Sequence, residues 1–357
     1  MPVLTIIPDI AERLISWFNQ HGRHDLPWQR DITPYRVWIS EIMLQQTQVA
    51  TVIPYFDTFM DHFPDCETLA NAHLDEVLHY WTGLGYYARA RNLHRAARLI
   101  MQDYGGVIPT DIDQLITLPG IGRSTAGAIL ALACEQRHPI LDGNVKRVLT
   151  RYHAVPGWPG LPGVEKQLWQ FAAQHTPYKN VAHYTQAIMD LGATVCTRRN
   201  PRCEVCPVNK DCYAYQQFRQ HEFPQAKPRK TIPVRKTVFA ILENHQGEIL
   251  LEHRPLTGIW GGLWAFPEFS SEGDMQSWVE GKLGYSINTL ECKSLIRHTF
   301  SHFHLDIMPV HARVNARHSR INDTDRYCWY EPWGKKYLGM ATPVKKLLQD
   351  ITLKTDE

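Results

Sequence analysis

Apolar residues recur at spacings of three and four from residue 8 to about residue 215, and this period predicts helices throughout that part of the chain. Short segments such as DITP, HFPD and GVIPTDID interrupt the period and predict turns between helices. Farther along the chain there are four β-like runs, at 237–244, 248–254, 302–314 and 326–332. The pattern therefore predicts a mostly α-helical region followed by an α+β region.

The segment between these regions, 218–235, is rich in Pro, Lys and Arg and has no apolar period, which is typical of a linker. We therefore expect an all-α domain over 1–217, this linker, and an α+β domain over 236–357. With 357 residues, 44% of them hydrophobic, the chain is long enough to bury a full core in each domain.

No apolar run is long enough to cross a bilayer, so the sequence predicts no membrane contact. The first residues lack a basic segment and a small-residue cleavage site, and Asp9 and Glu12 follow soon after. We therefore expect no secretory signal and a cytosolic protein. Thiols stay reduced in the cytosol, so clustered cysteines favour metal binding over disulfides.

The net charge of +2 does not by itself indicate a polyanionic partner. Arginines are concentrated locally, however, because Arg91, Arg95 and Arg98 recur on one face of a predicted helix in a stretch without acids. A solvated helix face and a nucleic-acid contact both fit this stripe, and the two interpretations stay open.

Half of the eight cysteines lie in the loop 196–212: Cys196, Cys203, Cys206 and Cys212. Four thiolates can hold Zn²⁺ or an iron–sulfur cluster. Structural zinc sites usually use two close pairs, and only one close pair is present, which favours a cluster without excluding zinc. Basic residues outnumber acidic ones in this loop, as suits contact with a phosphate backbone.

The segment 110–133 predicts two helices joined by the turn LPGIG, a helix–hairpin–helix. We expect Thr110 to cap the first helix and the second to start near Arg123. Gly120 and Gly122 permit positive φ and expose backbone N–H groups at a helix N-terminus, which suits a phosphate oxygen. An ordinary corner between two helices is the alternative.

Two carboxyl residues lie in unusual surroundings. Glu41 belongs to a predicted helix crowded with apolar residues, where burial would keep it protonated near neutral pH as a general acid. Asp142 opens the segment DGNVKRV after the second hairpin helix. A solvent-facing Glu41 and a merely capping Asp142 are the alternatives. One neutral and one ionised carboxyl group flanking a bond are suited to cleaving a glycosidic bond.

Five motifs in fixed order resemble the MutY family of adenine DNA glycosylases, within the endonuclease III-like helix–hairpin–helix superfamily. They are SEIMLQQTQV, WTGLGYYARARNLHRAA, LPGIGRSTAGAI, DGNVKRV and the four-cysteine loop, within a resemblance that runs from about residue 8 to residue 310. The resemblance implies a [4Fe–4S] cluster on the four cysteines. It also implies base-excision repair of duplex DNA in which adenine is mispaired with 8-oxoguanine or guanine, by a monomer associated with the bacterial nucleoid.

The resemblance also implies roles for single residues. Glu41 would protonate N7 of the flipped adenine, Asp142 would stabilise or trap the oxocarbenium ion, and Asn144 would help to orient the site. Further positions match DNA-contacting residues of the family: Gln45, Gln46, Thr47, Leu84, Tyr86, Gly120, Gly122 and Ser124. Tyr86 would fill the gap that the extruded base leaves.

Ser124 occupies the place where bifunctional members of the superfamily carry a Schiff-base lysine. A hydroxyl cannot form an imine, so we expect a monofunctional glycosylase, with Lys146 near Asp142 as a source of occasional imine formation. A bifunctional endonuclease III-like glycosylase/lyase is the alternative enzyme. A zinc-bearing module that binds DNA without catalysis is the alternative from another class.

The C-terminal region resembles the Nudix fold of 8-oxo-dGTP hydrolases through GLWAFPEF, but it lacks their glutamate-rich Mg²⁺ helix. We therefore expect a reader of the oxidised base and not a pyrophosphatase. Phe300, Ser301 and His302 match the family's loop that contacts 8-oxoguanine. For Phe303 and His304, the alternative is that they are core residues of a β-hairpin. An abasic endonuclease or a sliding clamp would be a suitable partner for the product, although no motif requires either.

Overall fold

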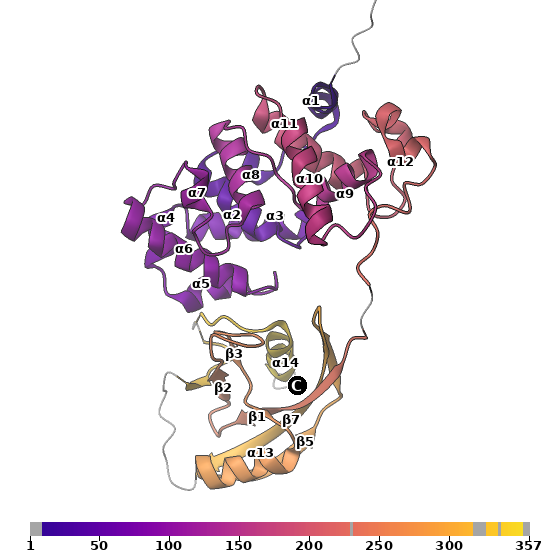
Figure 1. Cartoon of the computed structure of the whole chain (residues 1–357). Helices are drawn as coiled ribbons and strands as arrows, with labels where there is room; N and C mark the ends of the chain where they lie inside the picture. The colour runs from indigo at the N-terminus through magenta and orange to yellow at the C-terminus, as the bar shows by residue number, and fades with distance from the viewer. Residues whose placement is uncertain (1–8, 229–230, 317–325, 335–336, 353–357) are drawn as a thin grey trace, which may run out of the picture. The chain divides into compact units, whose positions relative to one another are not determined.

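The structure is a computed structural model that describes residues 9–228, 231–316, 326–334 and 337–352. Contacts divide the described chain into two compact units. The first contains the residues up to Asn71 together with 92–228, and the second contains 72–91 together with the residues from 231 onward. Each unit is described by itself (Figure 1).

The first unit is entirely helical, as the apolar period predicted. Its α-helices are α1 (Ile10–His21), α2 (Pro34–Leu44), α3 (Val49–His62), α4 (Cys66–Asn71), α6 (Ala88–Tyr104), α7 (Ile112–Leu115), α8 (Arg123–Cys134), α9 (Gly143–Tyr152), α10 (Pro162–His175), α11 (Val181–Asp190) and α12 (Tyr213–Gln216). The first residues of α6 belong to the second unit. Short 3₁₀ turns cover Pro27–Gln29, Cys203–Val205 and Asn209–Asp211, and a π-helical turn covers Leu191–Val195. A buried core joins α1, α8, α9, α10 and α11.

The predicted hairpin is present as α7, a turn and α8, with α8 starting at Arg123 as expected. Two details of the prediction were wrong. Asp111 caps α7 in place of Thr110, since its carboxylate accepts a hydrogen bond from the Gln114 N–H at 3.0 Å. Gly120 adopts a positive φ of 83°, whereas Gly122 has a φ of −92° and is the N-cap of α8, a conformation that needs no glycine.

The second unit combines α5 (Leu74–Trp81) with a mixed eight-stranded sheet flanked by helices. Its strands are β1 (Val234–Glu243), β2 (Ile249–His253), β3 (Trp264–Ala265), β4 (Glu268–Phe269), β5 (Tyr285–Cys292), β6 (Ile296–Thr299), β7 (His304–Ala316) and β8 (Tyr327–Tyr330). The main order is β3-β2-β1-β7-β5; β4 pairs with β1, β6 with β7 and β8 with β2. β1 and β7 are parallel, with Val234 opposite His304.

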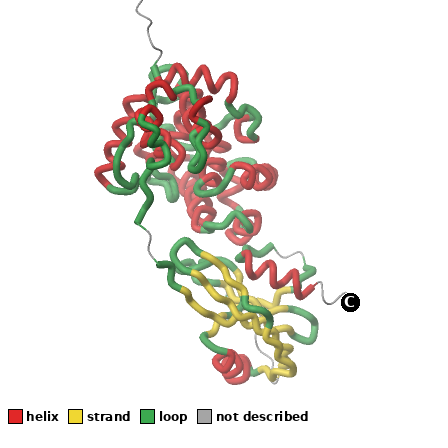
Figure 2. The backbone as a smooth tube through the Cα atoms, turned by 90° about the vertical axis from the view of Figure 1, so that its right-hand side faces the viewer, coloured by secondary structure: helices red, strands yellow, loops and turns green. Residues whose placement is uncertain are grey.

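Two helices, α13 (Glu272–Trp278) and α14 (Thr342–Thr352), lie on opposite sides of this sheet (Figures 1 and 2). A short π-helical turn, Val279–Leu283, continues α13. Met275 and Val279 pack with the inward residues of β1 and β7 in the buried core. Over the described ranges, every helix is too short or too polar to cross a membrane.

Candidate active site

Glu41 lies near the end of α2, a helix that begins with Thr33 as N-cap and Pro34 in its first turn. Its apolar neighbours Trp38 and Ile42 are at most 1% exposed. Burial, followed by the negative charge of Asp142, raises the pKa of Glu41 to about 8. Glu41 keeps partial solvent contact, but it does not lie on a solvent-facing helix surface as the alternative interpretation required.

Asp142 caps α9, because its Oδ1 accepts a hydrogen bond from the Val145 N–H at 2.8 Å. Burial raises the pKa of this carboxyl group, while hydrogen bonds from Val145 and Asn144 and the charge of Arg147 act in the opposite direction. The capping role expected of an isolated Asp is therefore real, and it coexists with electrostatic coupling to Glu41. Carboxyl groups coupled in this way do not ionise together easily, so one of them retains a proton.

The segment that leads into Asp142 is fixed by Ser124, whose Oγ accepts a hydrogen bond from the Leu141 N–H at 2.9 Å. Lys146 lies one helical turn beyond Asp142. Its Nζ donates to Oε1 of Glu165 on α10 at 2.6 Å, in an ion pair.

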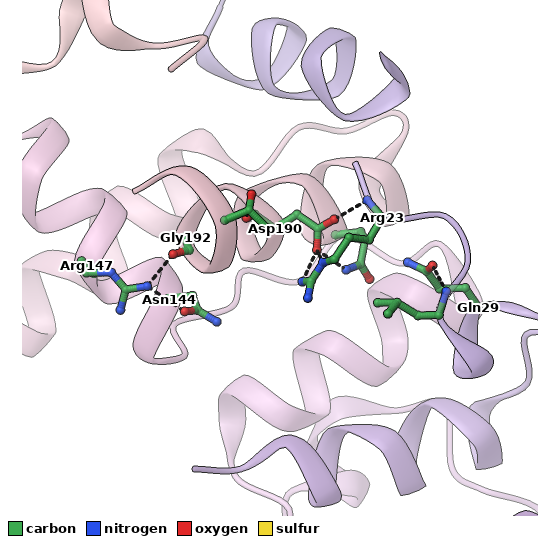
Figure 3. A network of polar contacts seen from close by, with 9 residues as sticks. Arg23, Gln29, Asn144, Arg147, Asp190 and Gly192 are labelled. Carbon is green, nitrogen blue, oxygen red and sulfur yellow. Dashed lines mark hydrogen bonds and ion pairs between the residues drawn. The ribbon is translucent and has the colours of Figure 1, made fainter. Parts of the chain in front are cut away.

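Arg147 joins the Asp142 end of α9 to the π-helical turn (Figure 3), and it also contacts the cysteine loop. Its Nη2 donates to Asn144 Oδ1 at 2.8 Å and to Gly192 O at 2.6 Å. Its Nε donates to Cys196 O at 2.7 Å. A Cβ added to Gly192 would lie 2.6 Å from Cβ of Asn144, so only glycine allows this approach. Arg147 was not predicted as a site residue, because the residues near it in the sequence do not indicate these contacts.

The four clustered cysteines form no disulfide bonds and line one cavity. Arg151, which is 3% exposed, also lines it and donates from Nη1 to Cys196 Sγ at 3.3 Å. Burial first, and then mutual repulsion among the thiolates, raises the pKa of Cys203 to about 11 and that of Cys206 to about 12. Buried thiolates crowded in this way need a positively charged metal centre, and this donor set fits a cluster.

Nowhere in the described ranges do three His, Cys, Asp or Glu side chains converge as ligands of a single metal ion. A cubane cluster binds each thiolate to its own iron atom, so it does not require the four sulfurs to meet at one point.

A second buried polar network, which no pattern in the sequence predicted, joins Arg23 to Asp190 (Figure 3). Asp190, 1% exposed, accepts from the Arg23 N–H at 2.8 Å, the Arg23 Nε at 3.1 Å and the Gln186 Nε2 at 2.9 Å. Gln186 also lines a cavity together with Trp28 and Val37, and Val37 precedes Glu41 by one turn of α2. Arg23 and Asp190 are 167 positions apart, so no local motif reveals them.

The expected DNA-contacting residues of the first unit lie near the hairpin. The Gln45 side-chain amide donates to Gly120 O at 3.5 Å and to Thr125 Oγ1 at 3.4 Å. Gln46 is exposed with a φ of 60°, while Thr47 is partly exposed. In the second unit, Leu84 is buried, and Tyr86 is 50% exposed with a φ of 50°.

The expected base-reading loop connects β6 and β7. Phe300 is half-buried, Ser301 and His302 are exposed, and Phe303 is fully buried as a core residue. Glu268, in the Nudix-like segment, is half-buried, and its Oε1 lies 2.9 Å from Nη1 of Arg254 in an ion pair. The negative charge of Glu268 is therefore balanced by the guanidinium group of Arg254.

Family models match three successive parts of the chain. Residues 39–191 match the HhH-GPD superfamily base excision DNA repair protein, 196–212 match the iron-sulfur binding domain of endonuclease III, and 238–350 match the NUDIX domain. The fold likewise resembles solved structures. A thermostable thymine-DNA glycosylase is 29% identical with a TM-score of 0.53, covering 58% of this chain and 95% of that one. A non-covalent endonuclease III–DNA complex is 20% identical with a TM-score of 0.50, covering 58% and 94%, and supports the fold alone.

Relatives match over nearly the whole chain. The adenine DNA glycosylase of Buchnera aphidicola subsp. Acyrthosiphon pisum (strain APS) is 39% identical, covering 96% of this chain and 97% of that protein. The adenine DNA glycosylase of Homo sapiens is 36% identical, covering 83% and 66%. The family, the fold and the cluster implied by the sequence are thereby confirmed. The chain belongs to the adenine DNA glycosylases, hydrolases of the N-glycosyl bond that act on DNA in base-excision repair, and it carries a [4Fe–4S] cluster.

Proposed function

We propose that the chain removes adenine paired with 8-oxoguanine or guanine, with Glu41 as general acid. Glu41 gives its proton to N7 of the extruded adenine, and the C1′–N9 bond breaks with its electron pair going to the base. Asp142 stabilises the resulting oxocarbenium ion, or traps it, until water adds to C1′ and loses a proton to the carboxylate. Asn144, fixed by Arg147, orients the Asp142 end of the site.

The observation that supports this mechanism is the coupling of two carboxyl groups from different elements, one of them surrounded by apolar side chains. The test uses a duplex with adenine opposite 8-oxoguanine, followed by hot alkali to reveal abasic sites. Asp142→Asn should bind this duplex with near wild-type affinity and lose turnover. Base release at the wild-type rate by this variant would contradict the mechanism, and failure of the wild type to release adenine would favour a binding module.

We propose that the enzyme is monofunctional, because Ser124 holds the Leu141 backbone and Lys146, one helical turn beyond Asp142, is paired with Glu165. Purified protein should therefore leave strands intact until alkali is added. Nicking without alkali at the rate of adenine release would instead support the bifunctional alternative.

We propose Cys196, Cys203, Cys206 and Cys212 as the cluster ligands. The exposed arginines of their loop then lie on the DNA backbone, together with the hairpin residues Gly120 and Gly122. Replacing one ligand with serine should lower bound iron, whereas Cys328→Ser, in the Nudix-like core, should leave iron unchanged. We further propose that Ser301 and His302, exposed between two aromatic residues, contact 8-oxoguanine. An abasic endonuclease is the fitting recipient of the product.

A further inference from the structure

The loop between β6 and β7 is fixed at both ends by stacked rings. Phe300 N–H donates to Phe303 O at 2.9 Å, and the two rings lie 4.6 Å apart at 22°. Phe303 is completely buried, so the pair anchors the loop in the core. Only Ser301 and His302, between these rings, are exposed.

Trp260 contacts this loop from another part of the chain. The rings of Trp260, His298 and Phe300 contact one another, with centroid distances of 5.4 Å from Trp260 to each of the other two and 4.6 Å between those two. Trp260 is 7% exposed and also packs against Phe239 of β1 at 6.0 Å. The indole of Trp260 therefore connects β1, the central strand of the sheet, to the Phe300 ring. Phe300 directly precedes the exposed tip of the loop, Ser301 and His302.

The backbone of Trp260 is strained, with a φ of 54° that bulky residues rarely adopt. Neighbouring contacts impose it. Leu263 N–H donates to Trp260 O at 3.0 Å, and Gly262 N–H donates to Arg254 O at 3.1 Å. A Cβ at Gly261 would lie 2.4 Å from Leu256 O, so the chain is tightly confined there. Strain of this kind persists only where the surroundings hold it, and it concentrates at functional sites.

We propose that Trp260 is a positioning residue for recognition of the oxidised base. Its indole holds the Phe300 ring and thereby fixes the direction of Ser301 and His302. This inference rests on the proposed role of that tip as the reader of 8-oxoguanine. Trp260 itself touches neither the base nor the catalytic carboxyl groups in this account, so its loss should change discrimination and not the chemical step.

The test measures affinity for two duplexes that carry a non-cleavable adenine analogue, one opposite 8-oxoguanine and one opposite guanine. Trp260→Phe should lower the preference for 8-oxoguanine by about five- to tenfold, the scale on which one aromatic contact acts. Its rate of adenine release from a guanine mispair, at saturating enzyme, should stay at the wild-type value.

Trp278→Phe is the matched control. Trp278 packs against Phe269 at 5.1 Å and Tyr327 at 5.9 Å, outside the ring cluster of the loop. This control should lower the melting temperature and keep the wild-type preference. If Trp260→Phe also keeps it, the inference is overturned.

A Ser301→Ala variant separates this inference from the function on which it rests. If Ser301→Ala lowers the preference and Trp260→Phe does not, only the positioning role fails. If Ser301→Ala itself leaves the preference unchanged, the proposed reader fails. Should Trp260→Phe unfold the domain, His298→Leu removes another ring of the same cluster, and an unchanged preference there overturns the inference equally.

Discussion

Glu41 retains its proton at a pH where an exposed glutamate has lost it, because ionisation would place a second negative charge in a buried site beside Asp142. Adenine release should therefore decline as pH rises through about 8. Glu41→Gln should release adenine about 10²- to 10⁴-fold more slowly and lack this decline. Single-turnover rates across pH check both expectations, and a persistent decline in the variant would assign it to another group.

The raised pKa of Glu41 also makes folding stability depend on pH. The folded state holds a proton that the unfolded state releases above its ordinary pKa of 4.5, so the stabilisation is complete below that value and is lost as pH rises to about 8. Relative to Glu41→Gln, the wild type should lose up to about 5 kcal/mol over this range. Thermal melts of both proteins measure the difference, and Glu12→Gln, exposed on α1, is the control. Parallel curves for wild type and Glu41→Gln would refute the burial argument.

Single residues differ in how far the sequence reveals them. Glu41 stands out because its apolar neighbours are adjacent along one helix, and the cysteines because their spacing is dense. Asp190 and Arg23 meet only after folding, and Arg147 acts through carbonyl groups of distant residues. Contacts of that kind leave no periodic trace in a single sequence.

Helix α9 carries Asp142 at one end and Arg151 near the other. Arg151 donates from Nε to Phe223 O at 2.9 Å and from Nη1 to Thr197 O at 2.7 Å, besides its contact with Cys196. Arg151→Ala leaves these buried acceptors without a partner, which should cost about 3 kcal/mol of stability. It should also lower the iron content.

Iron per protein, the visible absorbance of the cluster and thermal melting together check this expectation. Arg95→Ala, on the exposed face of α6, is the control and should behave as the wild type. Full iron occupancy with an unchanged melting temperature in Arg151→Ala would show that α9 does not support the cluster loop.

At the level of elements, the four runs expected as strands are strands β1, β2, β7 and β8. Four further strands were not predicted: β3 and β4, which are two residues long each, and β5 and β6. β5 buries little beyond Tyr285 and has exposed residues on both faces, so it shows no alternation. β6 spans only Ile296–Thr299, and it is a strand because it pairs with β7, a contact that its own sequence does not indicate. Likewise, the one-residue difference in the cap of α7 depends on local geometry, which propensity does not resolve.

Across the whole molecule, a net charge of +2 gives little general attraction for DNA, so binding depends on where the cations lie. Arg198 and Arg199 are exposed in the cluster loop. Replacing both with alanine should weaken binding to matched and mispaired duplexes alike and reduce the salt dependence by about two charges. Titrations at several salt concentrations measure this, with exposed Lys346→Ala as the control. A selective loss for the mispair would mean that these arginines read the lesion.

The division of the chain into units illustrates what composition can and cannot reveal. We predicted a linker over 218–235 from the change of residue types along the chain. Residues 72–91 belong by their contacts to the second unit, where Tyr87 Oη donates to Met340 O at 3.1 Å. The helical period of residues 72–91 does not indicate a contact with Met340, which is 253 positions from Tyr87.

Gly192 contributes no functional group, yet its missing side chain governs how closely the π-helical turn approaches Asn144. A methyl group there would displace the start of α9, and Asp142 and Asn144 with it, although it removes no reactive atom from the enzyme. A survey of natural or random variants should therefore find position 192 as intolerant as the acids themselves. A glycine-to-alanine change at this position adds only a methyl group, but it should reduce activity because that methyl group overlaps Asn144.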